Sequence, residues 1–477
     1  MIGCRKVARH KYWAAVAAGL LMILTGCTVG PNYQRPPVPV APAFRGADGT
    51  KVAGVNGANG ASLGDGKWAE VFHEPKLEAL IRTALSNNYD VQIAAQRVLE
   101  QQAQLRVVHS QEFPTLSVGG TGIGAELPDS LSNTLGNSIY AGSFDLSAAW
   151  TPDFWGLYRR QTQAARAQLL AEAWAQRAVR MTLVEQVAST YIQLNALERQ
   201  LTITRKTLQV RQQSVDLTRR LTDAGSAPLS DLREAQELEY TASSQIPQIE
   251  QQIQQQENSL RLLLGEDPGP VAFSDETALA PPPQSPPLGL PSRLLERRPD
   301  IEEAEQQLIA ANAQIGVARA EFFPQLAISV AGGVGGDQWS NLFDPGGHTI
   351  YGIGSLVQPI FEAGKLRGQL QLSEHQKEEM VLNYQKTIAS AFRDVSNALI
   401  ALNKQKASQQ QQVLLVAAAQ NAAGLAEMRY QAGATSYLEV LTTDSNLFSA
   451  QLNLVNAQQG EALSLVQLYA ALGGGWQ

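Results

Sequence analysis

Cys27 is the residue whose type and surroundings point most directly to chemistry. The segment Leu24-Thr25-Gly26-Cys27 has the form of a lipoprotein cleavage box, in which small residues precede a cysteine that becomes the new N-terminus. An apolar run over residues 12–23 precedes it and is shorter than the ~20 residues of a transmembrane helix. The alternative, an uncleaved anchor with a chance cysteine, is disfavoured by this placement. We expect cleavage after residue 26, a covalent lipid on Cys27 and no other cofactor.

Cleavage would also change the charge and the thiol content of the chain. It removes Cys4, so Cys27 would be the only cysteine and no intrachain disulfide could form in an oxidising compartment. It also removes four basic residues and no acidic ones, which lowers the formal net charge from −7 to −11. An acidic chain is a poor match for phosphate, so we expect no nucleic-acid partner.

Residues for catalysis or metal binding do not occur in a recognisable arrangement. The histidines show no paired metal spacing, and no Gly-x-Ser-x-Gly elbow is present. A short Gly64-Asp65-Gly66-Lys67 segment resembles a phosphate loop only faintly, because Trp68 follows where a Ser or Thr is required. The sequence therefore predicts neither an enzyme nor a metal site. The histidines stand at positions 10, 73, 109, 348 and 375.

The helical and strand-like segments of the chain occur twice, about 208 residues apart. Each copy contains a helical stretch, a Gly-rich pair of strand-like segments, a long helical stretch and, after a Gly, another helix. A tandem duplication is the simplest origin of this order. The landmark pairs are Phe113-Pro114 with Phe323-Pro324, Pro152-x-Phe154 with Pro359-x-Phe361, and Ala224-Gly225 with Ala432-Gly433.

The helical stretches are far longer than the ~12 residues usual in globular domains. Residues 157–224 contain no Gly or Pro, and a continuous helix of that length would span roughly 100 Å. A similar run covers residues 369–423, and the partner helices extend to about Leu264 and Leu472, with a kink expected at Pro247. Such helices must lie against one another as coiled-coil-like rods, because a lone helix buries too little apolar surface.

The strand segments alternate between apolar and small or polar residues. Between Tyr140 and Trp150 the residues at even positions, such as Phe144 and Leu146, share one face, and Leu326, Ile328 and Val330 alternate in the same way in the second copy. Segments 115–124 and 350–358 show the pattern more weakly. It fits a membrane barrel, and equally an ordinary sheet on a core. Four strands cannot close a barrel, which needs at least eight, so two or three chains would have to combine.

Three motifs, taken together and in this order, resemble the outer membrane factor family, the outer membrane efflux lipoproteins of tripartite resistance-nodulation-division type pumps. The resemblance covers essentially the whole mature chain. The motifs are Val29-Gly30-Pro31-Asn32-Tyr33, then Arg298-Pro299-Asp300-Ile301 with Ala304-Glu305, and finally Leu468-Tyr469-x-Ala471-Leu472-Gly473-Gly474-Gly475-Trp476.

The resemblance implies an α+β membrane protein that acts as a homotrimer. Each chain would give four strands to a 12-stranded outer-membrane β-barrel and four helical segments to a periplasmic helical barrel. A mixed belt would surround the helical barrel near residues 68–86, 266–298 and the C-terminal end. The expected division begins with a signal peptide at 1–26 and a lipidated tether at 27–66. A first repeat at 67–280 would contain strands near 115–152 and helices over 157–264. After a connector at 281–298, a second repeat at 299–477 would contain strands near 325–360 and helices over 366–472.

The same resemblance implies a passive exit duct in the cell outer membrane, extending into the periplasm. The implied partners are a periplasmic adaptor (membrane fusion) protein, an inner-membrane efflux pump and outer-membrane lipid. Drugs, solvents, metal ions and small metabolites would share the duct, since selection is expected at the pump. The alternatives are a lipid-anchored periplasmic helical scaffold without a pore and a lipid-anchored envelope enzyme, for which no convergent polar site is found.

In the family, paired helices turn over and converge at the periplasmic end, which places a gate at segments 224–228 and 432–436. Asp231 and Glu439 follow these turns, and six such carboxylates in a trimer would draw cations and hinder anions. Leu438 is a candidate for a hydrophobic ring, and Tyr430 for a hydrogen bond that holds the helices closed. Family members often carry an Asp where this sequence has Thr442. In the alternative interpretation, the two acids only cap or solvate the helix starts.

Overall fold

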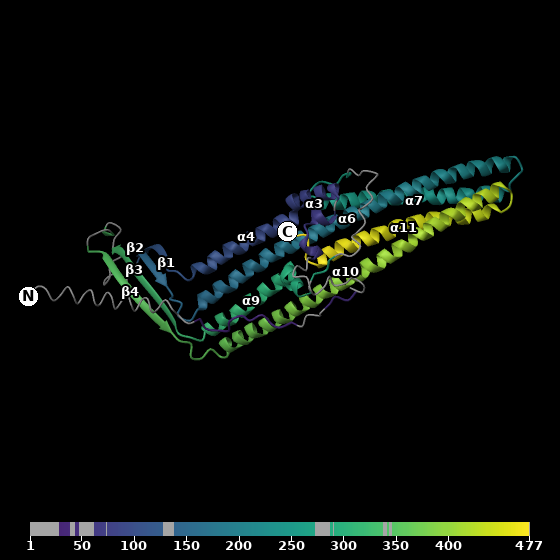
Figure 1. Cartoon of the computed structure of the whole chain (residues 1–477). Coiled ribbons are helices and arrows are strands. Elements are labelled where there is room, and N and C mark those ends of the chain that lie inside the picture. Colours follow the sequence, from purple (N-terminus) through teal and green to yellow (C-terminus); the bar gives the residue numbers. More distant parts are fainter. Residues whose placement is uncertain are drawn as a thin grey trace, which may run out of the picture. The chain divides into compact units, whose positions relative to one another are not determined.

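The helices and strands follow one another in an order that the chain runs through twice (Figure 1). The structure is a computed structural model that describes residues 28–38, 43–46, 62–72, 74–126, 138–271, 287–289, 291–336, 341–342 and 346–476, with backbone only at 125–126 and 138–140. The first copy contains α4 (Tyr89–Ser110), β1 (Thr115–Glu126), β2 (Ser138–Trp150), α6 (Leu157–Asp223) and α7 (Leu229–Leu263). The second contains α9 (Pro299–Ala320), β3 (Gln325–Gly336), β4 (His348–Val357), α10 (Lys365–Gln431) and α11 (Tyr437–Ala471).

Matching helices in the two copies have the same length. The helices α4 and α9 have 22 residues each, α6 and α10 have 67, and α7 and α11 have 35. Short elements precede each copy. These are η1 (Leu63–Asp65), α2 (Trp68–Phe72) and α3 (Pro75–Asn87) before the first, and η2 (Pro291–Arg293) and α8 (Leu294–Arg297) before the second.

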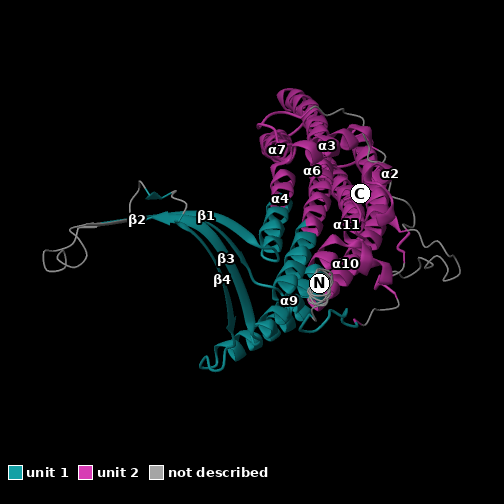
Figure 2. Cartoon of the chain, turned by 90° about the vertical axis from the view of Figure 1, so that its left-hand side faces the viewer, with its two compact units in different colours: residues 1–37, 98–172, 304–384 teal, residues 38–97, 173–303, 385–477 magenta. Residues whose placement is uncertain are grey.

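The chain divides into two compact units, coloured separately in Figure 2. Unit 1 comprises residues 1–37, 98–172 and 304–384 and contains the sheet. Unit 2 comprises residues 38–97, 173–303 and 385–477 and contains the ends of the helical hairpins α6–α7 and α10–α11.

Unit 1 contains one antiparallel sheet with the strand order β1-β2-β3-β4. Its register confirms the alternation expected from the sequence: Leu146 of β2 lies opposite Val118 of β1, and Trp150 lies opposite Ile328 of β3. These side chains are exposed, from 36% at Ile328 to 76% at Val118. The opposite face carries small polar residues such as Ser143, and also Tyr351 and Ile353 of β4. A sheet with an exposed apolar face requires an apolar environment on that side.

The long helices run through residues at which the sequence suggests an interruption. Helix α10 includes Gly368 and Gly424, whereas the breaker-free run alone predicts 369–423. Helix α7 continues through Pro247. A Gly inside a helix costs only about 1 kcal/mol relative to Ala, which packing along a long partner can offset. No helix in the described part of the chain combines the length and apolar character that crossing a membrane requires.

Unit 2 has a helical core of closely spaced apolar positions. In α6, Leu183, Val187, Tyr191 and Leu194 are at most 4% exposed, and their spacing of three or four residues places them on one face. The segments expected to form a belt pack together in this unit. The ring centre of Phe72 lies 5.7 Å from that of Tyr469, and Arg298 donates to the Ala471 carbonyl at 3.2 Å.

In unit 1, residues 29–35 are held by specific hydrogen bonds rather than left as a free tether. Arg160 donates to the carbonyl of Val29 at 3.1 Å and to that of Gly30 at 3.2 Å. Glu305, which is 5% exposed, accepts from the Tyr33 hydroxyl at 3.0 Å and forms a two-pronged ion pair with Arg35. Burial, followed by the nearby Glu305 charge, raises the pKa of Tyr33. The motif that begins at Val29 therefore fixes the chain soon after the predicted lipid site.

Candidate functional site at the hairpin ends

The two hairpins end in turns of the same geometry. Gly225 and Gly433 both have a φ of +71°, and each donates its N–H to the residue three positions earlier, at 2.9 Å. The next residue bonds back five positions, from Ser226 to Leu221 and from Ala434 to Arg429, both at 2.8 Å. This is the glycine C-terminal cap, which satisfies the last carbonyls of a helix while the chain reverses. The duplicated Ala-Gly landmark therefore marks the two hairpin ends.

We expect Gly433→Ala to loosen the second turn. Nothing lies within 4 Å of a Cβ built on Gly433, so the cost is the left-handed backbone alone, about 1–2 kcal/mol. Amide hydrogen exchange over residues 432–436 should then be about 5–30 times faster. Gly424→Ala is the matched control, because it also has open space but lies inside α10, where Ala is favoured. Equal exchange in the two variants would contradict this account of the turn.

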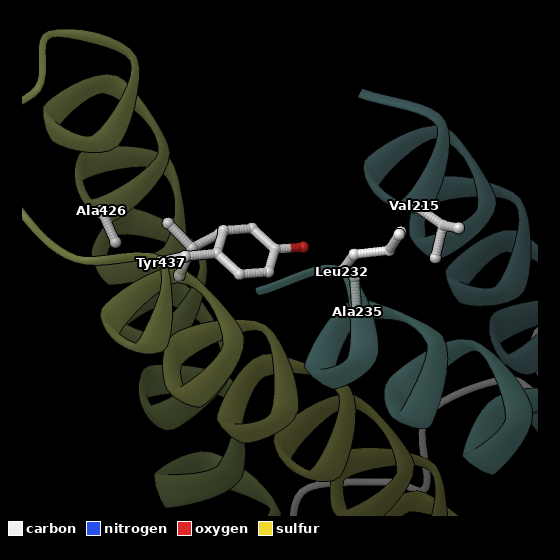
Figure 3. Packing of buried hydrophobic residues seen from close by; sticks show 6 residues of the cluster. Val215, Leu232, Ala235, Ala426 and Tyr437 are labelled. Atoms are coloured by element: carbon white, nitrogen blue, oxygen red, sulfur yellow. The ribbon is translucent and has the colours of Figure 1, made fainter. Parts of the chain in front are cut away.

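A buried apolar cluster joins the two hairpins near these turns (Figure 3). In Figure 3 the ring of Tyr437, at the start of α11, extends toward Leu232 and Ala235 of α7. Tyr437 is 4% exposed, and its hydroxyl lies 2.7 Å from that of Ser214 on α6. The cluster comprises Val215, Leu232, Ala235, Ala426, Tyr437 and Val440. Separating the hairpins would therefore expose apolar surface and break a hydrogen bond.

Arg211 of α6 makes a second connection between the hairpins. Its Nε and Nη2 both lie 2.9 Å from Oδ2 of Asp444 on α11, and its Nη1 donates to the Leu238 carbonyl of α7 at 2.9 Å. The guanidinium also lies 5.1 Å from the ring centre of Phe448. The Arg211 side chain is 5% exposed and that of Asp444 is 27% exposed. We call this buried ion pair the Arg211–Asp444 clasp.

A cavity of about 240 Å³ lies beside the clasp. All four helices of the two hairpins line it, including Arg211 of α6, Leu238 of α7, Glu427 of α10 and Asp444 of α11. The helices are therefore not close-packed at this level, and Ala235, Tyr437 and Val440 of the apolar cluster form part of the cavity wall.

Two of the predicted gate residues lie near each other. Tyr430 packs against the apolar cluster, with its ring centre 5.1 Å from that of Tyr437. Burial raises the pKa of Tyr430, and the negative charge of Asp231 adds to this effect. Asp231 is half-buried, accepts a hydrogen bond from the Ser230 hydroxyl at 3.2 Å, and follows the first turn directly. The structure thus brings a phenol from one hairpin close to a carboxylate from the other.

The other predicted residues lie on the second hairpin, and the contacts of Glu439 and Thr442 stay within that hairpin. Glu439 pairs with Arg429 at 2.8 Å and accepts from the Thr435 hydroxyl, so it also ties the turn together. Thr442 is exposed, and its hydroxyl donates to the Leu438 carbonyl one turn earlier, at 2.8 Å. Leu438 is 62% exposed and therefore available to another surface.

Sequence reasoning missed the clasp. Arg211 and Asp444 are 233 positions apart, and Arg211 stands in a helix rich in charged residues, where a solvated face is the usual interpretation. The only available signal in the sequence was that Asp444 follows the second turn by about two helical turns. In the described residues, no group of three or more His, Cys, Asp or Glu side chains could hold a metal ion. Cys27 lies outside the described residues.

The profile of the outer membrane efflux protein family matches this sequence twice, over residues 80–266 and 290–474. The chain is similar to the probable efflux pump outer membrane protein TtgC of Pseudomonas putida, with 37% identity over 95% of this chain and 94% of that protein. It is also similar to the cation efflux system protein CusC of Escherichia coli, with 34% identity over 96% of this chain and 97% of that protein.

Solved structures show the same fold. The open state of the MtrE outer membrane channel of Neisseria gonorrhoeae superposes with a TM-score of 0.84 at 27% identity, covering 94% of this chain and 99% of that channel. A CusC crystal structure superposes with a TM-score of 0.84 at 32% identity, covering 94% and 100%. The predicted duplication and fold class are confirmed by these matches.

Proposed function

Because the chain belongs to the outer membrane efflux protein family and is an outer membrane efflux channel rather than an enzyme, we propose that three copies build one continuous duct. Strands β1 and β4 are the two edges of the sheet within one chain, and four strands are too few to close a barrel. Three chains supply twelve strands, with the apolar faces around Leu146 and Ile328 toward lipid and the opposite face, which carries small polar residues such as Ser143, toward water. The exposed apolar face of this sheet is the observation that carries the proposal.

The duct is passive and works with two partners. TtgC is named as a probable outer membrane protein of an efflux pump and CusC as a protein of a cation efflux system, and the chain carries no recognisable nucleotide-binding motif. An inner-membrane pump supplies the energy, and a periplasmic adaptor joins the pump to the hairpin ends. The pore-less scaffold is not retained, since the chain matches channels over nearly its whole length.

The hairpin ends form the closed gate of the duct. Burial, and then the negative charge of Asp231 on the other hairpin, raises the pKa of the Tyr430 phenol, and Glu439 strengthens the second turn through Arg429 and Thr435. Leu438 offers an exposed apolar side chain for contact with a neighbouring copy, and Thr442 leaves that position uncharged. The acidic character of this gate rests chiefly on Asp231, because an arginine already neutralises Glu439.

Migration on a gel before and after heating tests the trimeric barrel. Membrane barrels stay folded in detergent until they are heated, and the folded form migrates differently on a gel from the unfolded chain. A trimer held by a shared barrel should therefore not dissociate in detergent at room temperature. Chemical cross-linking of the unheated protein should yield a species of three chains. A single-chain species whose migration does not change on heating would instead support a pore-less protein.

Replacing Cys27 by Ala should abolish the lipid and leave the trimer intact. The thiol is the only group in the cleavage box that can carry the lipid, while the barrel is itself a membrane anchor. Metabolic labelling with a radioactive fatty acid would report the lipid, and gel migration would report the trimer. Cys4→Ala is the control and should keep the label. A Cys27→Ala chain that failed to form trimers would contradict the expected independence of lipid and fold.

A further inference from the structure

The cavity beside the Arg211–Asp444 clasp has the size of a small organic molecule. Its volume of about 240 Å³ exceeds the ~150 Å³ of an apolar protein cavity that accepts benzene. Much of its wall is aliphatic, with Val210, Leu238, Val440, Leu441 and Leu447 contributing from three helices. One aromatic ring with a short side chain would fit this space and replace water along the apolar wall.

The charges on the wall favour a cation. Arg211 is already matched by Asp444 and by the Leu238 carbonyl, so this pair adds no net charge. Glu427 also lines the cavity, and it accepts a hydrogen bond from the Gln431 amide at 2.8 Å. In the described part of the chain no cation pairs with Glu427, and an amide donor leaves the carboxylate charge in place. The cavity therefore carries one uncompensated negative charge in a partly desolvated setting, where a positive charge is attracted most strongly.

We propose that this cavity is a binding site for a small aromatic or aliphatic organic monocation, with its ammonium group at Glu427 and its apolar body against Leu238 and Val440. The hydroxyl groups of Ser214 and Tyr437, which also line the cavity, offer further polar contacts.

Occupancy would bind the two hairpins together. The ligand touches α6 and α7 on one side and α10 and α11 on the other, so its contacts are complete only while the hairpins stay close. A ligand that binds one arrangement better shifts the population toward it. If the hairpin ends form the gate, as proposed above, the bound organic monocation therefore favours the closed duct.

Calorimetric titration of the purified full-length protein with 2-phenylethylamine tests the site, with 2-phenylethanol as the uncharged probe of the same shape. We expect saturable binding of one amine per chain and at least tenfold weaker binding of the alcohol. Glu427→Gln should weaken amine binding about tenfold, which corresponds to 1.4 kcal/mol, and leave the alcohol unaffected. Glu237→Gln, an exposed carboxylate beside Leu238, should leave amine binding unchanged.

A second pair of variants tests the location. Ala423 lines the cavity and Ala422, its neighbour on α10, is exposed. Ala423→Leu should abolish binding of both probes by filling the space, and Ala422→Leu should not. Absence of saturable amine binding, equal binding by these two variants, or an unchanged affinity in Glu427→Gln would overturn the site. Binding without any decrease in channel opening in a planar bilayer would overturn only the link to the gate.

Discussion

Replacing Asp444 by Leu is expected to weaken the packing between the two hairpins by about 3 kcal/mol. The substitution leaves the Arg211 guanidinium, whose side chain is 5% exposed, without its carboxylate, and an uncompensated buried charge costs about 3–5 kcal/mol. We place the effect at the lower end because the adjoining cavity can admit water to the guanidinium. Amide hydrogen exchange over the first two turns of α11 should become about 150 times faster.

A double variant separates the ion pair from general damage to the packing. Arg211→Met combined with Asp444→Leu removes both charges and should restore most of the protection, because apolar replacement of a buried pair is often neutral. Asp216→Leu is the control, since its pair with Arg219 lies on the same helix but is more than half exposed. If Asp444→Leu changed exchange no more than Asp216→Leu, or if the double variant were no better, the clasp would not hold the hairpins.

Removing the gate carboxylates should make the closed duct leak. Asp231→Ala together with Glu439→Ala is expected to raise the closed-state ion conductance, because Glu439 no longer ties the second turn, and to reduce the preference for cations, because the ring loses its negative charge. Asp231→Ala alone should have the greater effect on cation preference, because Arg429 already compensates Glu439. Glu439→Ala alone should chiefly loosen the second turn.

Planar-bilayer recordings at low and high salt would measure these effects. Exposed charges act over about 10 Å at 0.1 M salt and 3 Å at 1 M, so the difference in cation preference should shrink at high salt. Glu237→Ala, on the exposed side of α7, is the matched control. Unchanged conductance and selectivity in the double variant would remove Asp231 and Glu439 from the gate.

Local patterns made much of the architecture predictable. Period-two alternation between Tyr140 and Trp150 located β2, and the recurring Ala-Gly pair located both hairpin ends. These features are predictable from the sequence because they depend on residues that are close together along the chain. Helix α10 was longer than its breaker-free run, because tertiary packing tolerates Gly368 and Gly424 inside a helix.

The contacts between the two copies were not predictable in the same way. The clasp joins residues 233 positions apart, and the cavity depends on how four helices pack, which no local pattern records. The roles of individual acids likewise depend on partners. Glu439 and Asp231 hold equivalent places in the sequence repeat, but only Glu439 has an arginine on its own hairpin within ion-pair distance in the described structure.

Single-channel conductance of the purified protein in a planar bilayer, with its mass measured on the same preparation, tests the central claim most directly. A passive duct closed at an acidic periplasmic end predicts a species of three chains that gives small, cation-preferring currents. A single chain without channel activity would contradict the account, because the four-stranded sheet would then not be part of a shared barrel.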